Sequence, residues 1–281
     1  MNKPDGTSDI RNSVPRNIHD TPLTLVKTPM PIRLDKLLAD RALLPSRERA
    51  QAMVLAGRVL VNEQKVTKPG AQVAEDAIIR LLGEDLRYVS RGGLKLEKAL
   101  SHWSVDLTGR STVDIGASTG GFTDCMLQHG ATHVLAVDTG YGQIAHKLRA
   151  DERVRLLERT NARLLESGTL AREAAAPPTF FSMDVSFIGA SLVLPAVIPA
   201  LAALGATWSG EAVILVKPQF EAGREHVGKG GIVRDPAAHA IAIERVKQTI
   251  APLGASDIDV TESPITGTEG NREFLLHAIF T

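Results

Sequence analysis

The fold of this chain is decided by the stretch Asp114-Ile115-Gly116-Ala117-Ser118-Thr119-Gly120-Gly121-Phe122. A short apolar run ends here in an acid, a glycine-rich turn comes next, and a helical pattern begins after the turn. This order is typical of an α/β sheet that binds an adenosine-containing cofactor beyond the carboxyl end of a strand. The stretch therefore predicts such a sheet, with a cofactor site at this turn.

The chain alternates in the same way from residue 90 onward. Most segments between its apolar runs have helix length and end in Gly or Pro, which favours a doubly wound, Rossmann-like sheet with helices on both faces. The last two strand candidates are joined by residues 263–272, which lack a helical pattern, so we expect an antiparallel pair that closes the sheet. The seven expected strands are Ser111–Asp114, His133–Asp138, Val154–Leu157, Phe180–Asp184, Ala212–Lys217, Ser256–Glu262 and Glu273–Phe280.

Two acids favour S-adenosylmethionine over a dinucleotide as the cofactor. The turn lacks the dinucleotide pattern Gly-x-Gly-x-x-Gly. Asp114 stands just before the turn, where it would repel a phosphate and attract the cationic methionine half of S-adenosylmethionine. Asp138 ends the next strand, where a carboxylate can bind the ribose hydroxyls. A turn with a purely structural role is the alternative.

The preceding segment, residues 32–82, predicts a small α+β domain. Leu34, Leu37 and Leu38 share one face of a first helix, which Pro45 ends. Ser46 is a favourable N-cap for a second helix over residues 47–55.

Gly57 is a suitable residue just past the end of that helix. Short strands are expected at residues 58–62 and 77–81, with residues 65–70 in the turn region between them. Eight Lys or Arg residues stand against four acids between residues 33 and 70, which is either a patch for nucleic acid or a solvated face.

Four charged residues far apart in the sequence have local contexts that suit a cofactor site. Asp184 and Lys217 each end an apolar strand, Lys95 begins the first helix of the sheet region, and Glu273 begins the last strand. We expect Asp184 and Lys217 to face the cofactor, because ligands of open α/β sheets bind beyond the carboxyl ends of strands. Two lysines and two carboxylates suit proton removal from a weakly acidic hydroxyl such as that of an RNA ribose. Four unrelated surface charges are the alternative.

Lys217 is the candidate for that step, in either of two roles. A neighbouring cation such as Lys95 would help it lose its proton and act as a base. Asp184 would instead keep it charged, as a stabiliser of the developing alkoxide. Both roles stay open at the level of sequence.

The amino-terminal motifs resemble a known RNA-binding module. Arg-Leu-Asp-Lys-Leu-Leu, Ser-Arg-x-x-Ala and Gly-Arg-Val-x-Val-Asn, followed by Lys-x-x-Lys-Pro-Gly, resemble the αL module of ribosomal protein S-four. The resemblance covers residues 32–82 and implies contacts with RNA phosphates. The matching positions are Arg33, Lys36, Ser46, Arg47, Arg49, Arg58 and Lys68.

The motifs of the sheet region resemble the TlyA family, also called hemolysin A, whose catalytic domain is FtsJ-like. They include Ser-Arg-Gly-Gly-x-Lys-Leu, Asp-x-Gly-Ala-Ser-Thr-Gly-Gly-Phe-Thr, Asp-Val-Ser-Phe-Ile, Leu-Val-Lys-Pro-Gln-Phe-Glu and Gly-Asn-x-Glu. The resemblance implies S-adenosylmethionine-dependent 2′-O-methylation of a cytidine in ribosomal RNA. The catalytic set that it implies is Lys95, Asp184, Lys217 and Glu273, and the cofactor contacts are Asp114, Gly116, Ser118, Gly120, Phe122 and Asp138.

Family members that stop near the last strand are associated with the large ribosomal subunit. This chain ends at Thr281, directly after the strand candidate that begins at Glu273. We therefore expect a cytidine of large-subunit RNA as the main target.

Composition narrows the remaining classes. The chain has 281 residues, 43% of them apolar, and a net charge of +0, so affinity for ribosomal RNA or a ribosomal subunit must come from a local patch. The single cysteine, Cys125, excludes an intrachain disulfide and fits a reducing, cytoplasmic compartment. No run has the length of a membrane span, and no histidine spacing predicts a metal site. Residues 1–31 are expected to be a disordered tail, residues 83–89 a linker and residues 90–281 the catalytic domain; the oligomeric state is left open.

Two rival functions can be separated from methyl transfer. A pore-forming hemolysin needs a membrane-active segment, and none is visible. An RNA-binding assembly factor would keep the amino-terminal module but would have no use for Asp114, Asp138 and the catalytic set. The segment Gly223–Lys229 imitates a phosphate-binding loop, but Gly230 stands where Ser or Thr is required, so we expect a glycine-rich loop near the substrate.

Overall fold

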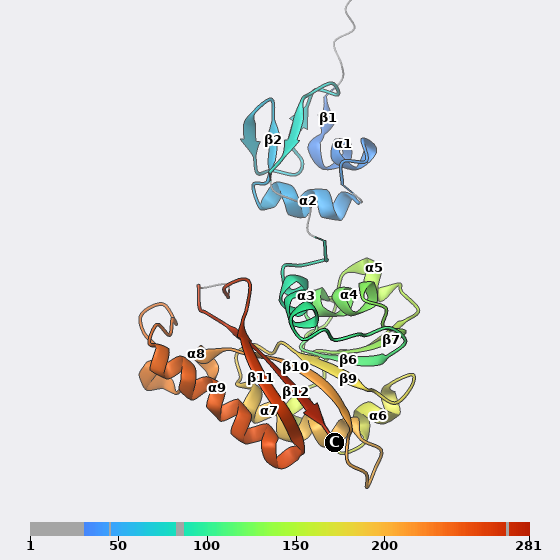
Figure 1. Ribbon diagram of the computed structural model, residues 1–281. Helices are drawn as coiled ribbons and strands as arrows, with labels where there is room; N and C mark the ends of the chain where they lie inside the picture. The colour runs from blue at the N-terminus through green and yellow to red at the C-terminus, as the bar shows by residue number, and fades with distance from the viewer. Residues whose placement is uncertain (1–30, 45, 83–86, 268–269) are drawn as a thin grey trace, which may run out of the picture. The chain divides into compact units, whose positions relative to one another are not determined.

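The computed structural model describes residues 31–44, 46–82, 87–267 and 270–281. The chain divides into two compact units, Met1–Asp85 and Leu86–Thr281 (Figure 1). This boundary falls inside the expected linker. Of the expected tail over residues 1–31, only residue 31 lies within the described residues. Pro45 and residues 83–86 of the expected linker also lie outside them.

The first unit is a small α+β domain with its own core. Leu34 and Leu38 of α1 (Leu34–Asp40) pack with Ala50 and Val54 of α2 (Arg47–Leu55) and with Val59. Its strands are β1 (Ile32–Arg33), β2 (Val59–Val61), β3 (Gln64–Val66), β4 (Gln72–Val73) and β5 (Ile79–Leu81). β1 pairs with β4, and β2 lies between β3 and β5, with every pair antiparallel.

The limits of α2 agree with the sequence prediction. The side chain of Ser46 accepts a hydrogen bond of 3.2 Å from the N–H of Arg49, which makes Ser46 the N-cap. Gly57, just past the end of the helix, has a φ of +65°, a conformation that glycine adopts without steric penalty.

The prediction that Lys65 lies in a turn was wrong. Lys65 belongs to β3 and pairs with Leu60 of β2, so the two strands form a tight hairpin. Asn62 and Glu63 make its two-residue turn, with φ values of +48° and +63°. Sequence reasoning missed this hairpin because such turns are normally recognised by glycine at the second position, and here glutamate occupies it.

The second unit is a seven-stranded sheet with the strand order β11-β12-β10-β9-β6-β7-β8. Its strands are β6 (Ser111–Ile115), β7 (His133–Val137), β8 (Val154–Leu157), β9 (Phe180–Met183), β10 (Gly210–Val216), β11 (Ala255–Glu262) and β12 (Phe274–Phe280). All seven expected strands are confirmed; β8 matches its expected range, and no end of the others shifts by more than two positions. β12 runs antiparallel to both of its neighbours, β10 and β11, whereas β10, β9, β6, β7 and β8 pair with one another in parallel. The sheet is therefore mixed, and the expected antiparallel pair closes it.

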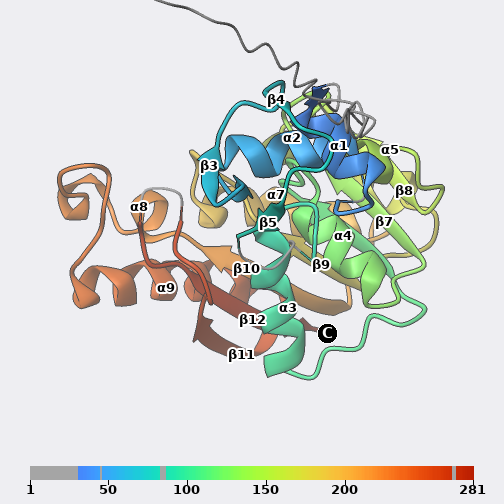
Figure 2. The same cartoon turned by 90° about the horizontal axis from the view of Figure 1, so that it is seen from above.

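Helices cover both faces of this sheet, as Figure 1 shows. One face carries α3 (Gly92–His102), α4 (Gly121–Gln128) and α5 (His146–Arg149); the other carries α6 (Thr169–Glu173), α7 (Ala190–Leu201), α8 (Pro218–Glu221) and α9 (Pro236–Ile250). Single 3₁₀ turns lie at Ala162–Leu164, Arg224–His226 and Ala251–Leu253. In Figure 2, α3 and α4 lie over the strands, where α3 contacts β12 and α4 contacts β6 and β7.

The order of the strands fixes where a ligand can bind. From β6 the chain continues to β7 and β8 on one side, and then crosses to β9 and β10 on the other side. The segments that follow β6 and β9 therefore separate at the carboxyl edge of the sheet, which is where open α/β sheets bind ligands. Gly116 follows β6 and Asp184 follows β9, so both lie at this point.

Candidate active site

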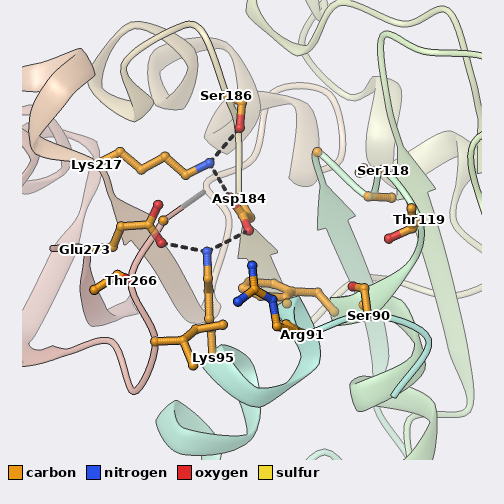
Figure 3. A pocket seen from close by; sticks show the side chains of 17 residues that line it. Ser90, Arg91, Lys95, Ser118, Thr119, Asp184, Ser186, Lys217, Thr266 and Glu273 are labelled. Carbon is orange, nitrogen blue, oxygen red and sulfur yellow. Dashed lines mark hydrogen bonds and ion pairs between the residues drawn. The ribbon is translucent and has the colours of Figure 1, made fainter. Parts of the chain in front are cut away.

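Four charged side chains from four different elements meet at the carboxyl edge of the sheet (Figure 3). Lys95 lies in the first turns of α3, Asp184 directly follows β9, Lys217 directly follows β10, and Glu273 directly precedes β12. Lys95 Nζ lies 2.6 Å from Glu273 Oε2 and 3.6 Å from Asp184 Oδ2, and Lys217 Nζ lies 2.6 Å from Asp184 Oδ1. The structure thus brings the four predicted catalytic residues together in a row in which negative and positive charges alternate.

Most of the row is withdrawn from solvent, and Asp184 is its most exposed member. Glu273 is 3% exposed and Lys95 is 7% exposed, whereas the side chain of Asp184 is 21% exposed. Lys217 Nζ also donates a hydrogen bond of 2.7 Å to Ser186 Oγ, so two acceptors fix its position. All five side chains line a cavity of about 300 Å³. A substrate oxygen that enters this cavity therefore meets a lysine whose geometry is already set.

The glycine-rich turn forms another wall of the same cavity. Gly116, Ser118 and Phe122, three of the residues predicted to bind the cofactor, line it. Gly116 has a φ of +88°, and a Cβ atom there would lie 2.5 Å from the carbonyl oxygen of Asp184. Only glycine fits here, because the backbone after β9 comes this close to the turn. Gly120 does not line the cavity; its φ of +92° and its contact with Leu148 show a conformational role.

A second cavity of about 320 Å³ shares Gly116, Ser118, Asp184 and Ser186 with the first. Its further walls are mostly apolar, formed by Ile115, Val137, Val185, Ile188 and Val193, with Asp138 and Asn161 among its polar residues. Apolar walls suit a flat base and a carboxylate suits a ribose diol. The two adjacent cavities therefore suit the adenosine and methionine halves of S-adenosylmethionine.

Asp138 ties the turn to the second cavity. One carboxylate oxygen accepts a hydrogen bond of 2.7 Å from the N–H of Ser118, and the other accepts one of 2.6 Å from the N–H of Gly140. The residue therefore lines the cavity and also holds the glycine-rich turn in place.

Asp114 was predicted to contact the cofactor, but its side chain lies beneath the glycine-rich turn. It is completely buried and lines neither cavity. Its carboxylate accepts a hydrogen bond of 2.6 Å from Thr123 Oγ1, and Ser182 Oγ lies 3.5 Å away. The side chain thus connects β6, β9 and α4 beneath the turn, where it can support the turn from below. The alternation of side chains along a strand places it there, and its position just before the turn did not reveal this.

The burial of Asp114 predicts a pH dependence of stability. Burial raises the pKa of its carboxyl to about 7, the charge of Asp184 adds to the effect, and the hydrogen bond from Thr123 opposes it. Between about pH 4 and pH 7 the folded protein therefore keeps a proton that the unfolded chain releases, so stability falls as pH rises through this window and levels off above it. We expect the unfolding free energy of Asp114→Asn to gain about 1–4 kcal/mol relative to the parent protein between pH 4 and pH 8.

Denaturant unfolding can be followed by tryptophan fluorescence, because both tryptophans, Trp103 and Trp208, lie in the second unit. Parallel stability curves for the two proteins across this pH range would contradict the prediction for Asp114.

The predicted RNA-binding residues of the first unit differ in their surroundings. Arg33 and Arg47 both contact Asp35, and Lys36 pairs with Asp40 at 2.7 Å. The hydroxyl of Ser46 is engaged as the N-cap of α2, which gives this residue a structural task. Arg58 and Lys68 are exposed and Arg49 is half-buried.

Sequence reasoning missed several residues that line the two cavities. Ser90, Arg91 and Ser186 line the first, and Asn161 lines the second. Ser186 stands two positions after Asp184 in the motif Asp-Val-Ser-Phe-Ile, so the signal was present, but the acid alone was selected. Phe187, the next residue, is 93% exposed at the edge of the second cavity.

Three further expectations concern loops, metals and membranes. The segment Gly223–Lys229 lines neither cavity, but Asn271 connects the chain just after it, at Gly231 and Val233, to the loop that carries Glu273. Within the described ranges, no cluster of His, Cys, Asp or Glu could hold a metal ion. Nor does that part of the chain contain a helix whose length and apolar content would let it cross a bilayer.

Comparisons with known proteins identify the family of the chain. Residues 88–280 match the family model described as FtsJ-like methyltransferase, and residues 32–79 match the S4 domain. The chain is 50% identical over 245 residues to YqxC of Bacillus subtilis, named as a candidate rRNA methyltransferase, with 87% of this chain and 84% of that protein covered.

Two further relatives extend the comparison. The chain is 39% identical to the protein of Mycobacterium tuberculosis named 16S/23S rRNA (cytidine-2′-O)-methyltransferase TlyA. The match covers 87% of this chain and 88% of that protein. A solved structure described as a candidate hemolysin from Streptococcus thermophilus superimposes with a TM-score of 0.67 at 45% identity, over 90% of this chain and 89% of that one.

Proposed function

Because this chain belongs to the TlyA (hemolysin A) family, in which an S4 domain precedes an FtsJ-like methyltransferase domain, we propose that it methylates the 2′-oxygen of a cytidine in ribosomal RNA. S-adenosylmethionine is the methyl donor. The observation that carries the proposal is the row Glu273–Lys95–Asp184–Lys217 beside the glycine-rich turn. A pure RNA-binding protein would gain nothing from two buried lysines and two carboxylates in a cavity.

The residues of the row have different roles in the proposed methyl transfer. S-adenosylmethionine, when bound, supplies an electrophilic methyl group that an oxygen atom of the substrate attacks. Lys217, between Asp184 and Ser186, is placed to act as an ammonium that stabilises the negative charge developing on the 2′-oxygen, while the proton of the hydroxyl passes to solvent water. The carboxylate 2.6 Å away favours this charged role over that of a base.

Lys95 and Asp184 hold the row in place. Lys95 lies between Glu273 and Asp184, so it keeps the two carboxylates apart and compensates both charges. Asp184 contacts both lysines and thereby sets the distance between them. The fixed geometry matters because methyl transfer requires the attacking oxygen in line with the methyl carbon.

Several groups at the mouth of the cavities suit an RNA substrate. The guanidinium of Arg91 lines the first cavity and can pair with a phosphate next to the target ribose. The exposed ring of Phe187 offers a face on which a base can stack. The S4 unit adds contacts to phosphates, which position the enzyme without reading the sequence.

We expect the large subunit to be the main target. Large-subunit RNA is named for the Mycobacterium tuberculosis relative together with small-subunit RNA, and a relative from Campylobacter jejuni, 32% identical over 68% of this chain, is named as a 23S rRNA (cytidine-2′-O)-methyltransferase. Purified large and small subunits that lack the modification should be incubated separately with the enzyme and labelled S-adenosylmethionine. Label should enter the large subunit and map to the ribose of a cytidine.

Two outcomes would contradict these proposals. Equal labelling of both subunits would show that the enzyme is not selective for the large one. If both subunits stayed unlabelled although the protein bound S-adenosylmethionine in calorimetry, methyl transfer to ribosomal RNA would be contradicted.

A further inference from the structure

One carboxylate of the S4 unit is completely buried and yet surrounded by exposed arginines. Asp35 accepts hydrogen bonds at Oδ1 from Arg33 Nε (3.0 Å) and from the N–H of Lys36 (2.9 Å). At Oδ2 it accepts from Arg33 Nη2 (2.8 Å), Arg47 Nε (3.2 Å) and Gln51 Nε2 (2.9 Å). The hydrogen bond from Arg33 holds the pKa of Asp35 well below its usual range, so the carboxylate stays charged. Five donors from β1, α1 and α2 thus converge on one side chain.

The two arginines are fixed but remain accessible. Their side chains are 45% exposed for Arg33 and 48% exposed for Arg47. Arg47 donates to Asp35 through Nε. Within the described residues, the Nη1 and Nη2 edge of its guanidinium therefore remains available for another acceptor. Gly70 lies beside Arg33, where a Cβ atom would come within 3.0 Å of Nη1. The turn after β3 therefore leaves space for this guanidinium.

An arrangement of this kind is a poor way to add stability. A buried carboxylate loses its hydration, and its ion pairs recover that loss only in part. The pair Arg80–Glu63 in the same unit shows the ordinary alternative, because both of its side chains are more than half exposed. What the Asp35 cluster provides is two guanidinium groups on the same oxygen atom, and hence a fixed distance from each other.

We infer that Asp35 is a positioning residue for RNA binding, which holds Arg33 and Arg47 so that together they bind one phosphate group of the RNA backbone. The planar fork of a guanidinium matches the oxygen atoms of a phosphate, and two forks held in advance lose little side-chain freedom on binding. The acid lowers the net positive charge of the face and still strengthens its contact with a polyanion. This inference rests on the proposed function for the identity of the ligand as ribosomal RNA.

The test compares two substitutions that remove the same charge. The full-length protein is titrated with protein-free large-subunit ribosomal RNA in filter-binding assays over a series of KCl concentrations. Asp35→Asn should weaken binding about tenfold, although it removes a negative charge from the RNA-binding face. The matched control, Glu63→Gln, removes an exposed acid that pairs with Arg80, and should leave affinity within about twofold or improve it. Affinity of folded Asp35→Asn equal to or tighter than that of the parent protein would overturn the inference.

A second pair of variants keeps the charge and the buried acid, and so decides the matter even if Asp35→Asn unfolds. Arg47→Lys should lower affinity about fivefold while the slope of log K against log salt stays unchanged, because the charge remains and the fork is lost. In methyl-transfer assays its KM for RNA should rise with kcat unaltered. Arg80→Lys, the control outside the cluster, should change neither quantity. Arg47→Lys with parental affinity would overturn the inference.

Failure of this inference can be told apart from failure of the proposed function. Parental affinity of Arg47→Lys in a protein that methylates RNA refutes the positioning role alone. Weakened binding by Arg47→Lys in a chain whose parent transfers no methyl group refutes the methyl transfer and leaves the role of Asp35 standing.

Discussion

Replacement of Lys217 by alanine should lower the rate of methyl transfer by about 10²–10⁴. Lys217 Nζ is held by Asp184 and Ser186 in the first cavity, where it meets the substrate oxygen, and the variant leaves the developing charge without a cation. Affinity for S-adenosylmethionine should stay within a few-fold, because Lys217 does not line the second cavity. Single-turnover assays at saturating RNA, together with calorimetry of cofactor binding, measure the two quantities separately.

The control for this variant is Lys98→Ala. It removes an exposed lysine of α3 that does not belong to the row of charges. It should retain full activity. If Lys217→Ala kept more than a tenth of the parental rate, Lys217 would have no part in the chemical step, and stabilisation of the oxygen would fall to Lys95.

Replacement of Asp138 by alanine should have the opposite profile, with cofactor affinity lost first. The variant removes the carboxylate suited to the ribose hydroxyls, and with it the acceptor for the N–H groups of Ser118 and Gly140. We expect the Kd for S-adenosylmethionine to rise roughly 10²-fold, since hydrogen bonds to a charged group are among the stronger ones. The rate at saturating cofactor should change much less, because the row of charges stays intact.

Asp106→Ala is the matched control for this second variant. Asp106 also accepts a hydrogen bond from a backbone N–H, that of Thr108, but it precedes β6 and so lies at the opposite edge of the sheet. It should leave cofactor affinity unchanged. A parental Kd in Asp138→Ala would show that the adenosine half binds elsewhere than in the second cavity.

The parts of this site that could be predicted from sequence are those set by strand ends. Asp184 and Lys217 each terminate an apolar run, and parallel strands bring their carboxyl ends to one edge whatever the lengths of the intervening helices. Glu273 and Lys95 could be selected only with the family motifs, because a residue at the start of a helix or strand has many destinations. Their meeting depends on β12 running antiparallel beside β10, which sequence patterns suggested without fixing its neighbour.

The parts that could not be predicted depend on contacts between segments. Asp114 is buried against Thr123 and Ser182, and no local sequence pattern predicts these two contacts. Gly120 is needed because Leu148 of α5 lies against it. The cluster around Asp35 was likewise hidden, because a count of charges does not show which of them contact one another.

The pairing of Lys95 with Glu273 has a consequence for how activity arises as the chain is made. The two residues are 178 positions apart, and Glu273 takes its place only when β12 enters the sheet between β10 and β11. Both cofactor cavities are built largely from earlier segments, so a ribosome must synthesise nearly the whole chain before the last carboxylate can join the row. Such a distant contact forms late and slowly during folding. A chain in which β12 has not yet entered the sheet therefore lacks the contact between Glu273 and Lys95.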